Sequence, residues 1–219
     1  MKVLELFAGT ESIGKVFREA GHEVFSVDAN TKFGCDLSKD IMTITIDDIP
    51  FKPDIIWASP PCPTFSTMSI STHWDSQGRP KTANAVRGMG NVLATLDIIK
   101  QLKPKYYFIE NPVGMLRKMA FMQDHNRVTV TYCQYGENYR KPTDIFTNLE
   151  GWKGKKCRNG ATCHESAPRT TSCINRTERK GVQRLKDNHE RAIIPKQLVE
   201  EILRVCESGP KTMKQQRLV

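Results

Sequence analysis

The chain has 219 residues, enough for one α/β domain with a sizeable core and a small additional segment. No apolar run approaches the roughly 20 residues that a membrane-spanning helix needs, and the N-terminus lacks the layout of a secretory signal. The seven cysteines are odd in number and scattered. We therefore expect reduced thiols in a cytoplasmic setting, serving catalysis or metal binding rather than disulfides.

The net charge of +9 is concentrated in the last third of the chain. Residues 1–150 contain 17 Lys and Arg and 17 Asp and Glu, whereas residues 151–219 contain 16 basic and 7 acidic residues. A solvated surface could have this composition. A neutral segment followed by a basic one is also the organisation expected of an enzyme that binds a polyanion such as nucleic acid.

The first 28 residues have the pattern of a strand, a glycine turn, a helix and a second strand. We expect strands at 2–8 and 22–27 and a helix at 11–20, with Gly9 in the turn and Asp28 at the tip of the second strand. Such a turn lets a ligand approach the backbone, and such an acid can bind ribose hydroxyls. An ordinary β-α-β unit with a tight turn would have the same pattern.

A cysteine follows the strand expected at 54–58. Ser59-Pro60-Pro61 ends that strand, because proline cannot continue a strand ladder, and Cys62 comes next. Ligands bind at the carboxyl ends of strands in open α/β sheets, where a thiol can act as a nucleophile. Free cysteines are more often buried as small apolar residues. The prolines and the long polar loop at 63–84 favour the nucleophile.

The remaining elements predict a doubly wound, mostly parallel α/β sheet. Strands are expected at 106–109, 127–132 and 144–148, and a helix at 195–206 with two buried rows, namely Ile194, Leu198 and Ile202, and Val199, Leu203 and Cys206. A helix at 86–102 is expected to bury Val86, Met89, Leu93, Leu96, Ile99 and Leu102. Glu110 follows an apolar strand, which should raise its pKa and suit it to hold a proton near neutrality.

Several of these segments resemble one family. Pro60-Pro61-Cys62-Pro63-Thr64-Phe65-Ser66 resembles the catalytic motif of the C5-cytosine DNA methyltransferases, in which Pro-Cys usually continues with Gln-x-Phe-Ser. Phe7-Ala8-Gly9-Thr10, followed by Gly14, is similar to the family's S-adenosylmethionine loop, with Glu11 in place of its middle glycine. Glu110-Asn111-Pro112 resembles the family's Glu-Asn-Val.

The resemblance implies an S-adenosylmethionine-dependent methyltransferase fold and a role for particular residues. Cys62 would be the nucleophile, Glu110 would contact N3 of cytosine, and Arg140, or its rival Lys141, would lie near O2. Asp40 would read the adenine of the cofactor, with Asp36 as an alternative. The implied cofactor-binding residues are Phe7, Ala8, Gly9, Thr10, Asp28, Asp40, Ile41 and Pro60.

Two further segments have family counterparts. The loop at 63–84 corresponds to one that closes over DNA, with Trp74, Gln77 and Arg79 as candidates to fill the space left by a flipped base. Residues 151–190 correspond to a small basic target-recognition insertion. Within this insertion, the cysteines and histidine could bind structural zinc or be reduced structural residues; the candidate ligands are Cys157, Cys163, His164 and Cys173.

The sequence thus predicts a compact, phage-type C5-cytosine methyltransferase that acts on DNA. Residues 1–150 would form the catalytic domain and 151–190 the insertion, followed by a returning helix at 191–208 and a basic tail at 209–219. Three alternatives stay open: methylation of RNA, a nucleic-acid-binding protein that has lost activity, and an N4-cytosine methyltransferase. The last also uses Ser-Pro-Pro, but it needs an aromatic residue where this chain has Cys62.

Overall fold

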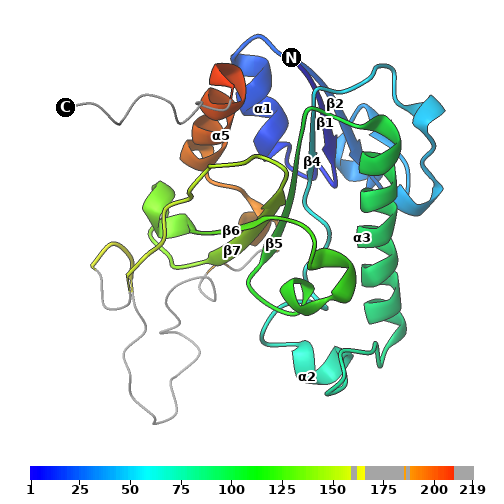
Figure 1. The fold of residues 1–219 in the computed structure, drawn as a ribbon, viewed down its shortest axis with the longest axis vertical. Coiled ribbons are helices and arrows are strands. Elements are labelled where there is room, and N and C mark those ends of the chain that lie inside the picture. Colours follow the sequence, from blue (N-terminus) through cyan, green and yellow to red (C-terminus); the bar gives the residue numbers. More distant parts are fainter. Residues whose placement is uncertain (159–161, 166–184, 186–187, 210–219) are drawn as a thin grey trace.

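The computed structural model describes residues 1–158, 162–165, 185 and 188–209 (Figure 1). The predicted basic tail lies outside these residues, apart from Gly209. None of the described helices has the length and hydrophobicity needed to cross a membrane.

The described residues form a seven-stranded sheet in the order β3-β2-β1-β4-β5-β7-β6. Strands β1 to β5 run parallel to one another, and β7 is antiparallel to both β5 and β6. The strands are β1 Lys2–Leu6, β2 Glu23–Asp28, β3 Leu37–Ser38, β4 Ile55–Ala58, β5 Tyr106–Pro112, β6 Arg127–Thr131 and β7 Pro142–Thr147. The predicted mostly parallel sheet is confirmed.

Helices cover both faces of this sheet (Figure 1). On one face α1 (Ser12–Glu19) lies beside α5 (Lys196–Ser208), and on the other lies α3 (Ala83–Leu102). Alternating residues of β1 belong to different cores, because successive side chains of a strand point to opposite faces. Val3 packs with α1 and α5, whereas Leu4 packs with α3. Two short helices, α2 (Ile70–His73) and α4 (Asn188–Ala192), were not expected.

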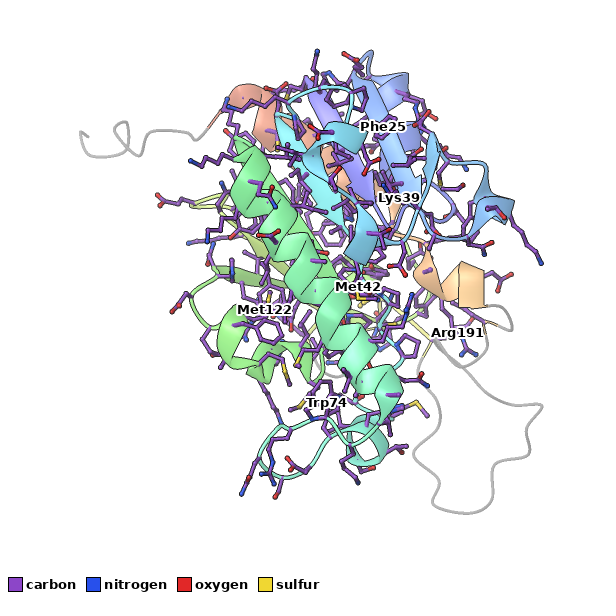
Figure 2. The ribbon with its side chains drawn as sticks, turned by 90° about the vertical axis from the view of Figure 1, so that its right-hand side faces the viewer. Phe25, Lys39, Met42, Trp74, Met122 and Arg191 are labelled. Carbon is purple, nitrogen blue, oxygen red and sulfur yellow. The ribbon has the colours of Figure 1, made fainter. Side chains whose placement is uncertain are left out.

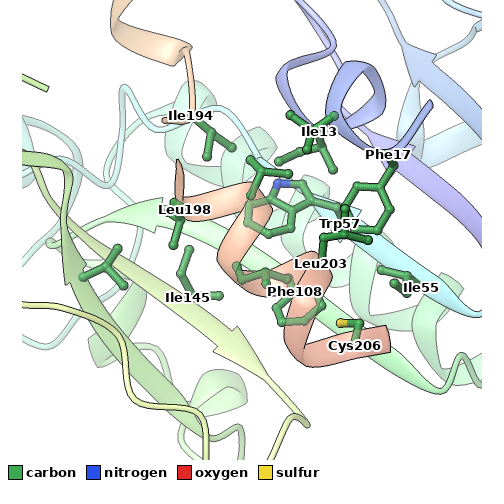
Figure 3. Packing of buried hydrophobic residues seen from close by; sticks show 14 of the residues in the cluster. Ile13, Phe17, Ile55, Trp57, Phe108, Ile145, Ile194, Leu198, Leu203 and Cys206 are labelled. Carbon is green, nitrogen blue, oxygen red and sulfur yellow. The ribbon is translucent and has the colours of Figure 1, made fainter. Parts of the chain in front are cut away.

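The prediction for α5 is confirmed in detail. All six residues expected to be buried are at most 7% exposed. Figure 3 shows Leu198, Leu203 and Cys206 of α5 packed with Ile13 and Phe17 of α1. The helix therefore returns to the first β-α unit and closes one face of the sheet.

The buried face of α3 was predicted only in part, because Ile99 is buried and Met89, Leu96 and Leu102 are partly buried against the core, but two expected residues are not. Val86 and Leu93 are 53% and 43% exposed. The residues turned toward the sheet include several that are small or polar, namely Ala85, Gly88, Asn91, Val92, Thr95, Ile98 and Ile99. A Cβ at position 88 would lie 2.7 Å from Thr64 Oγ1, so the helix approaches the loop after β4 too closely for a large side chain. Close packing at that loop, rather than hydrophobicity, decides which face is buried.

A buried carboxylate joins β1 to α1. Glu5 in the middle of β1 accepts hydrogen bonds from the backbone N–H groups of Ile13 (3.2 Å) and Gly14 (2.8 Å). These groups lie in the first turn of α1, where backbone donors lack partners within the helix. Burial raises the pKa of Glu5 to about 7, although the two hydrogen bonds oppose this rise. Glu5 thereby fixes the start of the helix that follows the glycine turn.

Candidate active site

Cys62 lies at the carboxyl end of β4, in a tight turn. Its carbonyl oxygen accepts hydrogen bonds from the backbone N–H groups of Phe65 and Ser66, both at 3.0 Å. On the other side of Cys62, the Asn111 side chain donates to the carbonyl oxygen of Pro60 at 2.9 Å. Cys62 is half-buried, so it faces neither open solvent nor the middle of the core.

In the second half of this turn, two backbone carbonyl groups accept hydrogen bonds from other segments. Met115 N donates to the carbonyl oxygen of Phe65 (2.7 Å), and Trp74 Nε1 donates to that of Thr64 (2.6 Å). The Trp74 ring also stacks on Phe65, with ring centroids 5.5 Å apart. The turn that carries Cys62 is therefore fixed by contacts from two other segments.

The structure contradicts the role suggested for Trp74 (Figure 2). Its side chain is 2% exposed and donates a hydrogen bond to a backbone carbonyl of the Cys62 turn, so it is not available to fill the space of a flipped base. The other two candidates, Gln77 and Arg79, are exposed. Arg79 forms an ion pair with Asp75 at 2.7 Å.

Glu110 lies in β5 just beyond the last residue that pairs with β4. The strand was expected to end at Ile109, but its pairing with β7 extends it to Pro112 and buries Glu110 to 6% exposure. The Tyr132 hydroxyl donates to Glu110 Oε1 at 3.0 Å. Burial raises the pKa of Glu110, as predicted from the apolar strand that precedes it. A carboxyl group in this environment can hold a proton at higher pH than usual.

The cation beside Glu110 is Lys141 and not Arg140. Lys141 is 9% exposed, and its Nζ lies 3.9 Å from Glu110 Oε1 and 4.6 Å from the centre of the Tyr132 ring. Nζ also donates to the carbonyl oxygen of Arg191 at 2.8 Å. Arg140 is exposed. The structure thus places Lys141 beside Glu110, whereas the expectation that Arg140 or Lys141 lies near O2 of a bound cytosine stays a prediction.

These two charged groups act on Cys62 in opposite directions. Burial raises the pKa of the Cys62 thiol, Glu110 raises it further, and Lys141 lowers it. The thiol, the carboxyl group and the ammonium group therefore form one electrostatic unit. In this unit a proton on Glu110 and the charge on Lys141 both favour the thiolate, the reactive form of cysteine.

A cavity of about 310 Å³ lies next to Cys62, at the carboxyl ends of β1, β2 and β4. Its size is that of a small-ligand pocket. The residues that line it are Phe7, Gly9, Thr10, Val27, Asp28, Ala29, Phe33, Lys39, Asp40, Ile41, Ser59, Pro61, Arg87, Asn91 and Ala192. Six of the eight cofactor-binding residues suggested by the sequence are among them. The other two, Ala8 and Pro60, are buried beside the cavity rather than in its lining.

The glycine turn after β1 forms one wall of this cavity. Gly9 has φ of 50°, in the left-handed region, and its N–H donates to Asp28 Oδ2 at 3.0 Å. Glu11, which replaces the family's middle glycine, also adopts a left-handed φ of 54°. Its carboxylate pairs with Arg18 at 3.1 Å and is not part of the cavity lining.

Asp40 and Asp36, the two alternatives for the adenine-binding acid, differ in their position relative to the cavity. Asp40 lines the cavity, and its carboxylate also accepts a hydrogen bond from Arg87. Asp36 is turned toward β2 and accepts from the backbone N–H (2.8 Å) and hydroxyl (2.7 Å) of Ser26. Asp40 is therefore the acid available to a ligand in this cavity.

Some lining residues were missed from the sequence. Arg87 and Asn91 lie on the α3 face that was predicted only in part, and Ala192 belongs to the unexpected helix α4. From the sequence, Tyr132 was expected only as the last residue of a strand, and nothing in the neighbouring sequence indicated a role in the site. Its role depends on the antiparallel pairing of β6, β7 and β5, which brings it to Glu110.

Three of the four suggested metal ligands lie together near β6. Cys157, Cys163 and His164 are joined there by Cys133, which was not predicted as a ligand. Cys173, the fourth residue suggested, lies outside the described residues.

The fold and the site define the class of protein. A crystal structure of a DNMT2 variant from Spodoptera frugiperda shares the fold with a TM-score of 0.51 and 19% identity, over 72% of this chain and 55% of that chain. The doubly wound sheet with its antiparallel β7 is thus the fold of S-adenosylmethionine-dependent methyltransferases. The family model described as C-5 cytosine-specific DNA methylase matches residues 1–147, so the chain belongs to that family.

Two curated relatives agree with this assignment. A probable DNA (cytosine-5)-methyltransferase of frog virus 3 is 30% identical over 170 residues, which cover 74% of this chain and 78% of the viral protein. The type II methyltransferase M.FnuDI of Fusobacterium nucleatum is 29% identical over 128 residues, which cover 54% of this chain but 34% of the bacterial enzyme. The chain therefore corresponds to most of the viral relative and to about a third of the bacterial one.

Proposed function

We propose that this protein transfers a methyl group to C5 of cytosine in DNA, with Cys62 as a covalent nucleophile. The observation that carries the proposal is the grouping of a half-buried thiol at the end of β4 with a buried carboxyl group and a buried ammonium group, next to a ligand-sized cavity. Membership of the C-5 cytosine-specific DNA methylase family supports the same reaction.

Cys62 would make C5 nucleophilic. The thiol releases its proton to solvent, and the thiolate sulfur adds to C6 of cytosine, which moves electron density onto C5. After methylation a base removes the C5 proton, and the thiolate leaves as the C5–C6 double bond re-forms. The target atom is inaccessible in a stacked duplex, so the cytosine must be flipped out or already unpaired.

Glu110 and Lys141 would stabilise the charge that this addition places on the ring. A protonated Glu110 can donate a hydrogen bond to N3, and burial raises its pKa, so the proton is retained to higher pH than in an exposed carboxyl group. Lys141 supplies a positive charge beside the same carboxyl group, in the role expected of the family's arginine near O2. Tyr132 positions Glu110 through its hydroxyl group.

The cavity beside Cys62 has the groups needed to hold S-adenosylmethionine. Asp28 lies at the end of β2, where ribose hydroxyls are bound in folds of this type, and Asp40 offers an acceptor for the adenine amino group. Gly9 allows close approach to the backbone of the first turn. The bound cofactor supplies the electrophilic methyl group.

The basic segment after β7 would contact the DNA backbone. Lys153, Lys155, Lys156 and Arg158 are exposed, and they precede a stretch of sequence with further basic residues. Contacts from such residues to phosphates position a protein on nucleic acid without reading its sequence. We therefore expect the affinity for DNA to fall steeply with added salt.

The test of the proposed reaction is covalent trapping on DNA that contains 5-fluorocytosine. With S-adenosylmethionine present, we expect the protein to form a stable covalent adduct, because fluorine at C5 cannot be removed as a proton is. The measurement is a band of reduced mobility in a denaturing gel, with mass spectrometry to locate the linkage at Cys62.

Matched variants separate this outcome from a general loss of the fold. Cys62→Ala should abolish the adduct, whereas Cys35→Ala, a change at another half-buried cysteine far from the site in sequence, should leave it intact. An adduct formed on RNA but not on DNA would replace DNA with RNA as the substrate. If neither substrate forms an adduct but S-adenosylmethionine still binds, the covalent mechanism is rejected.

Asp40 and Asp36, the two alternatives for the acid that binds the adenine of the cofactor, provide a second prediction. Asp40→Ala should weaken S-adenosylmethionine binding by about tenfold or more, because a lost hydrogen bond to a cofactor amino group is worth about 1.5 kcal/mol. Asp36→Ala should change affinity much less, since Asp36 bonds to Ser26 and not to the cavity. Isothermal titration calorimetry measures both, and the reverse order would reject our placement of the adenine.

A further inference from the structure

Three cysteines and a histidine converge beside the edge strand β6. They come from three places in the sequence: Cys133 from the turn after β6, Cys157 from the segment after β7, and Cys163 with His164 a few residues later. Their ligand atoms all lie within 4.8 Å of one another. No other part of the described chain brings together a comparable group of metal-binding side chains.

We propose that these four residues bind one structural Zn²⁺ ion, with Cys133, Cys157 and Cys163 as thiolate ligands and His164 as the imidazole ligand through Nδ1. Neither the family match nor the proposed methyl transfer requires this site, and its failure would leave both unaffected.

Four of the six distances between the ligand atoms are close to those of tetrahedral coordination, and the other two are at most 4.8 Å. Zn–S bonds of about 2.3 Å and Zn–N bonds of about 2.0–2.1 Å place neighbouring sulfurs about 3.8 Å apart and a sulfur and a nitrogen about 3.6 Å apart. The Cys163 sulfur lies 3.7 Å from that of Cys133 and 3.5 Å from that of Cys157. His164 Nδ1 lies 3.4 Å from the Cys163 sulfur and 3.6 Å from the Cys157 sulfur. One ion can therefore reach all four atoms with small adjustments.

Neighbouring groups support thiolate ligands and hold them in place. Gln134 Nε2 donates to the sulfur of Cys163 at 3.1 Å, and such outer hydrogen bonds orient and stabilise metal-bound thiolates. The backbone N–H of Cys157 donates to the Thr131 hydroxyl at 3.2 Å, which attaches this ligand to the end of β6. The exposed side chains of Lys156 and Arg158 flank Cys157 in sequence and can offset the negative charge of the site.

The chemistry of binding needs no oxidant or reductant. Each of the three thiols releases its proton to solvent as its sulfur binds the ion, and neutral His164 donates a lone pair. Three thiolates and one Zn²⁺ leave a complex with a charge of −1. Without the metal, the cluster would be joined by S–H hydrogen bonds, which are weak.

The site would attach the basic segment to the catalytic sheet. Residues 153–165 include few apolar side chains to pack against the core, and small segments of this kind are commonly stabilised by a metal. The ion would join this segment to the turn of Cys133, whose neighbour Tyr132 contacts Glu110. This link places the start of the proposed DNA-contacting segment at a fixed position relative to the active site.

The test is the metal content of the full-length protein purified without chelators. We expect inductively coupled plasma mass spectrometry to find about one zinc per chain. Cys133→Ser and Cys163→Ser should lose most of it, and Cys35→Ser should retain it. Cys173→Ser separates this site from one that uses Cys173, and it should also retain zinc.

Cobalt substitution tests the same ligands even if a serine variant fails to fold. Co²⁺ bound to wild type should give the visible absorption bands of a tetrahedral site and thiolate charge-transfer bands in the near ultraviolet. His164→Cys should keep the tetrahedral bands and increase the charge-transfer absorption, because a fourth thiolate replaces the imidazole. Well under one zinc per chain together with no cobalt spectrum would overturn the proposal. Loss of zinc in Cys173→Ser but not in Cys133→Ser would overturn the assignment of Cys133.

Discussion

Lys141→Met is expected to lower the rate of methyl transfer by about 10²–10³-fold, which is the usual effect of removing one preorganised group that stabilises transition-state charge. Lys141 is the buried cation at 3.9 Å from Glu110, and methionine keeps most of its length without its charge. Single-turnover kinetics with saturating DNA and S-adenosylmethionine measure the effect on the chemical step rather than on binding.

The pH dependence of this variant should also change. Lys141 lowers the pKa of both Cys62 and Glu110, so both values should rise when its charge is removed. A higher Cys62 pKa means that the thiolate forms only at higher pH, and the rising limb of the pH–rate profile should therefore move upward. A loss of activity without any movement of this limb would indicate general damage to the fold instead.

Two other variants serve as controls for Lys141. Lys141→Arg retains the charge and should recover part of the rate, limited by the shape of a site built for a single ammonium group. Arg140→Met removes the neighbouring exposed cation and should leave the chemical step within a few-fold of wild type. If Arg140→Met instead had the larger effect on rate, Arg140 would be the catalytic cation and our reading of the geometry would be wrong.

The sequence predicted those parts of the site that depend on local order along the chain. Cys62, Glu110 and Asp28 each follow an apolar run, so their places at strand ends could be inferred from hydrophobic patterning. The cores of β1, β4 and α5 were predicted for the same reason. In these segments the periodic pattern and the tertiary environment agree.

The errors have a common physical cause in contacts between distant segments. Gly88 lies on the buried face of α3 because the Cys62 turn passes close to the helix there. Hydropathy cannot indicate such a close approach. Lys141 rather than Arg140 enters the site because β7 begins at Pro142 and sets the direction of the preceding side chain. Cys133 was missed as a ligand because it lies 24 positions before Cys157 in the sequence. The two are brought together by hydrogen bonds between the segment after β7 and Thr131 at the end of β6.

Gly114→Ala is expected to destabilise the protein by about 3 kcal/mol, at the upper end of the usual cost of overpacking. A Cβ at this position would overlap the backbone carbonyl oxygen of Phe65 and lie 3.3 Å from Ser66 Cα. Gly114 does not have a positive φ, so the effect is purely steric. The backbone cannot move away easily, because the Phe65 ring is fully buried and stacked on Trp74. Urea unfolding followed by circular dichroism gives the change in the free energy of unfolding.

Gly90→Ala is the matched control, since its Cβ would meet only the sulfur of Met42, a flexible side chain that is 43% exposed. Alanine favours a helix interior over glycine by about 1 kcal/mol, so this variant should be neutral or slightly more stable. Gly114→Ala should also change the rate at which Cys62 reacts with iodoacetamide, because Ser66 pairs with Gly114 and its N–H bonds to the carbonyl oxygen of Cys62. Unfolding free energies and Cys62 reactivities equal to those of wild type would show that the turn bearing the nucleophile is not fixed by this contact.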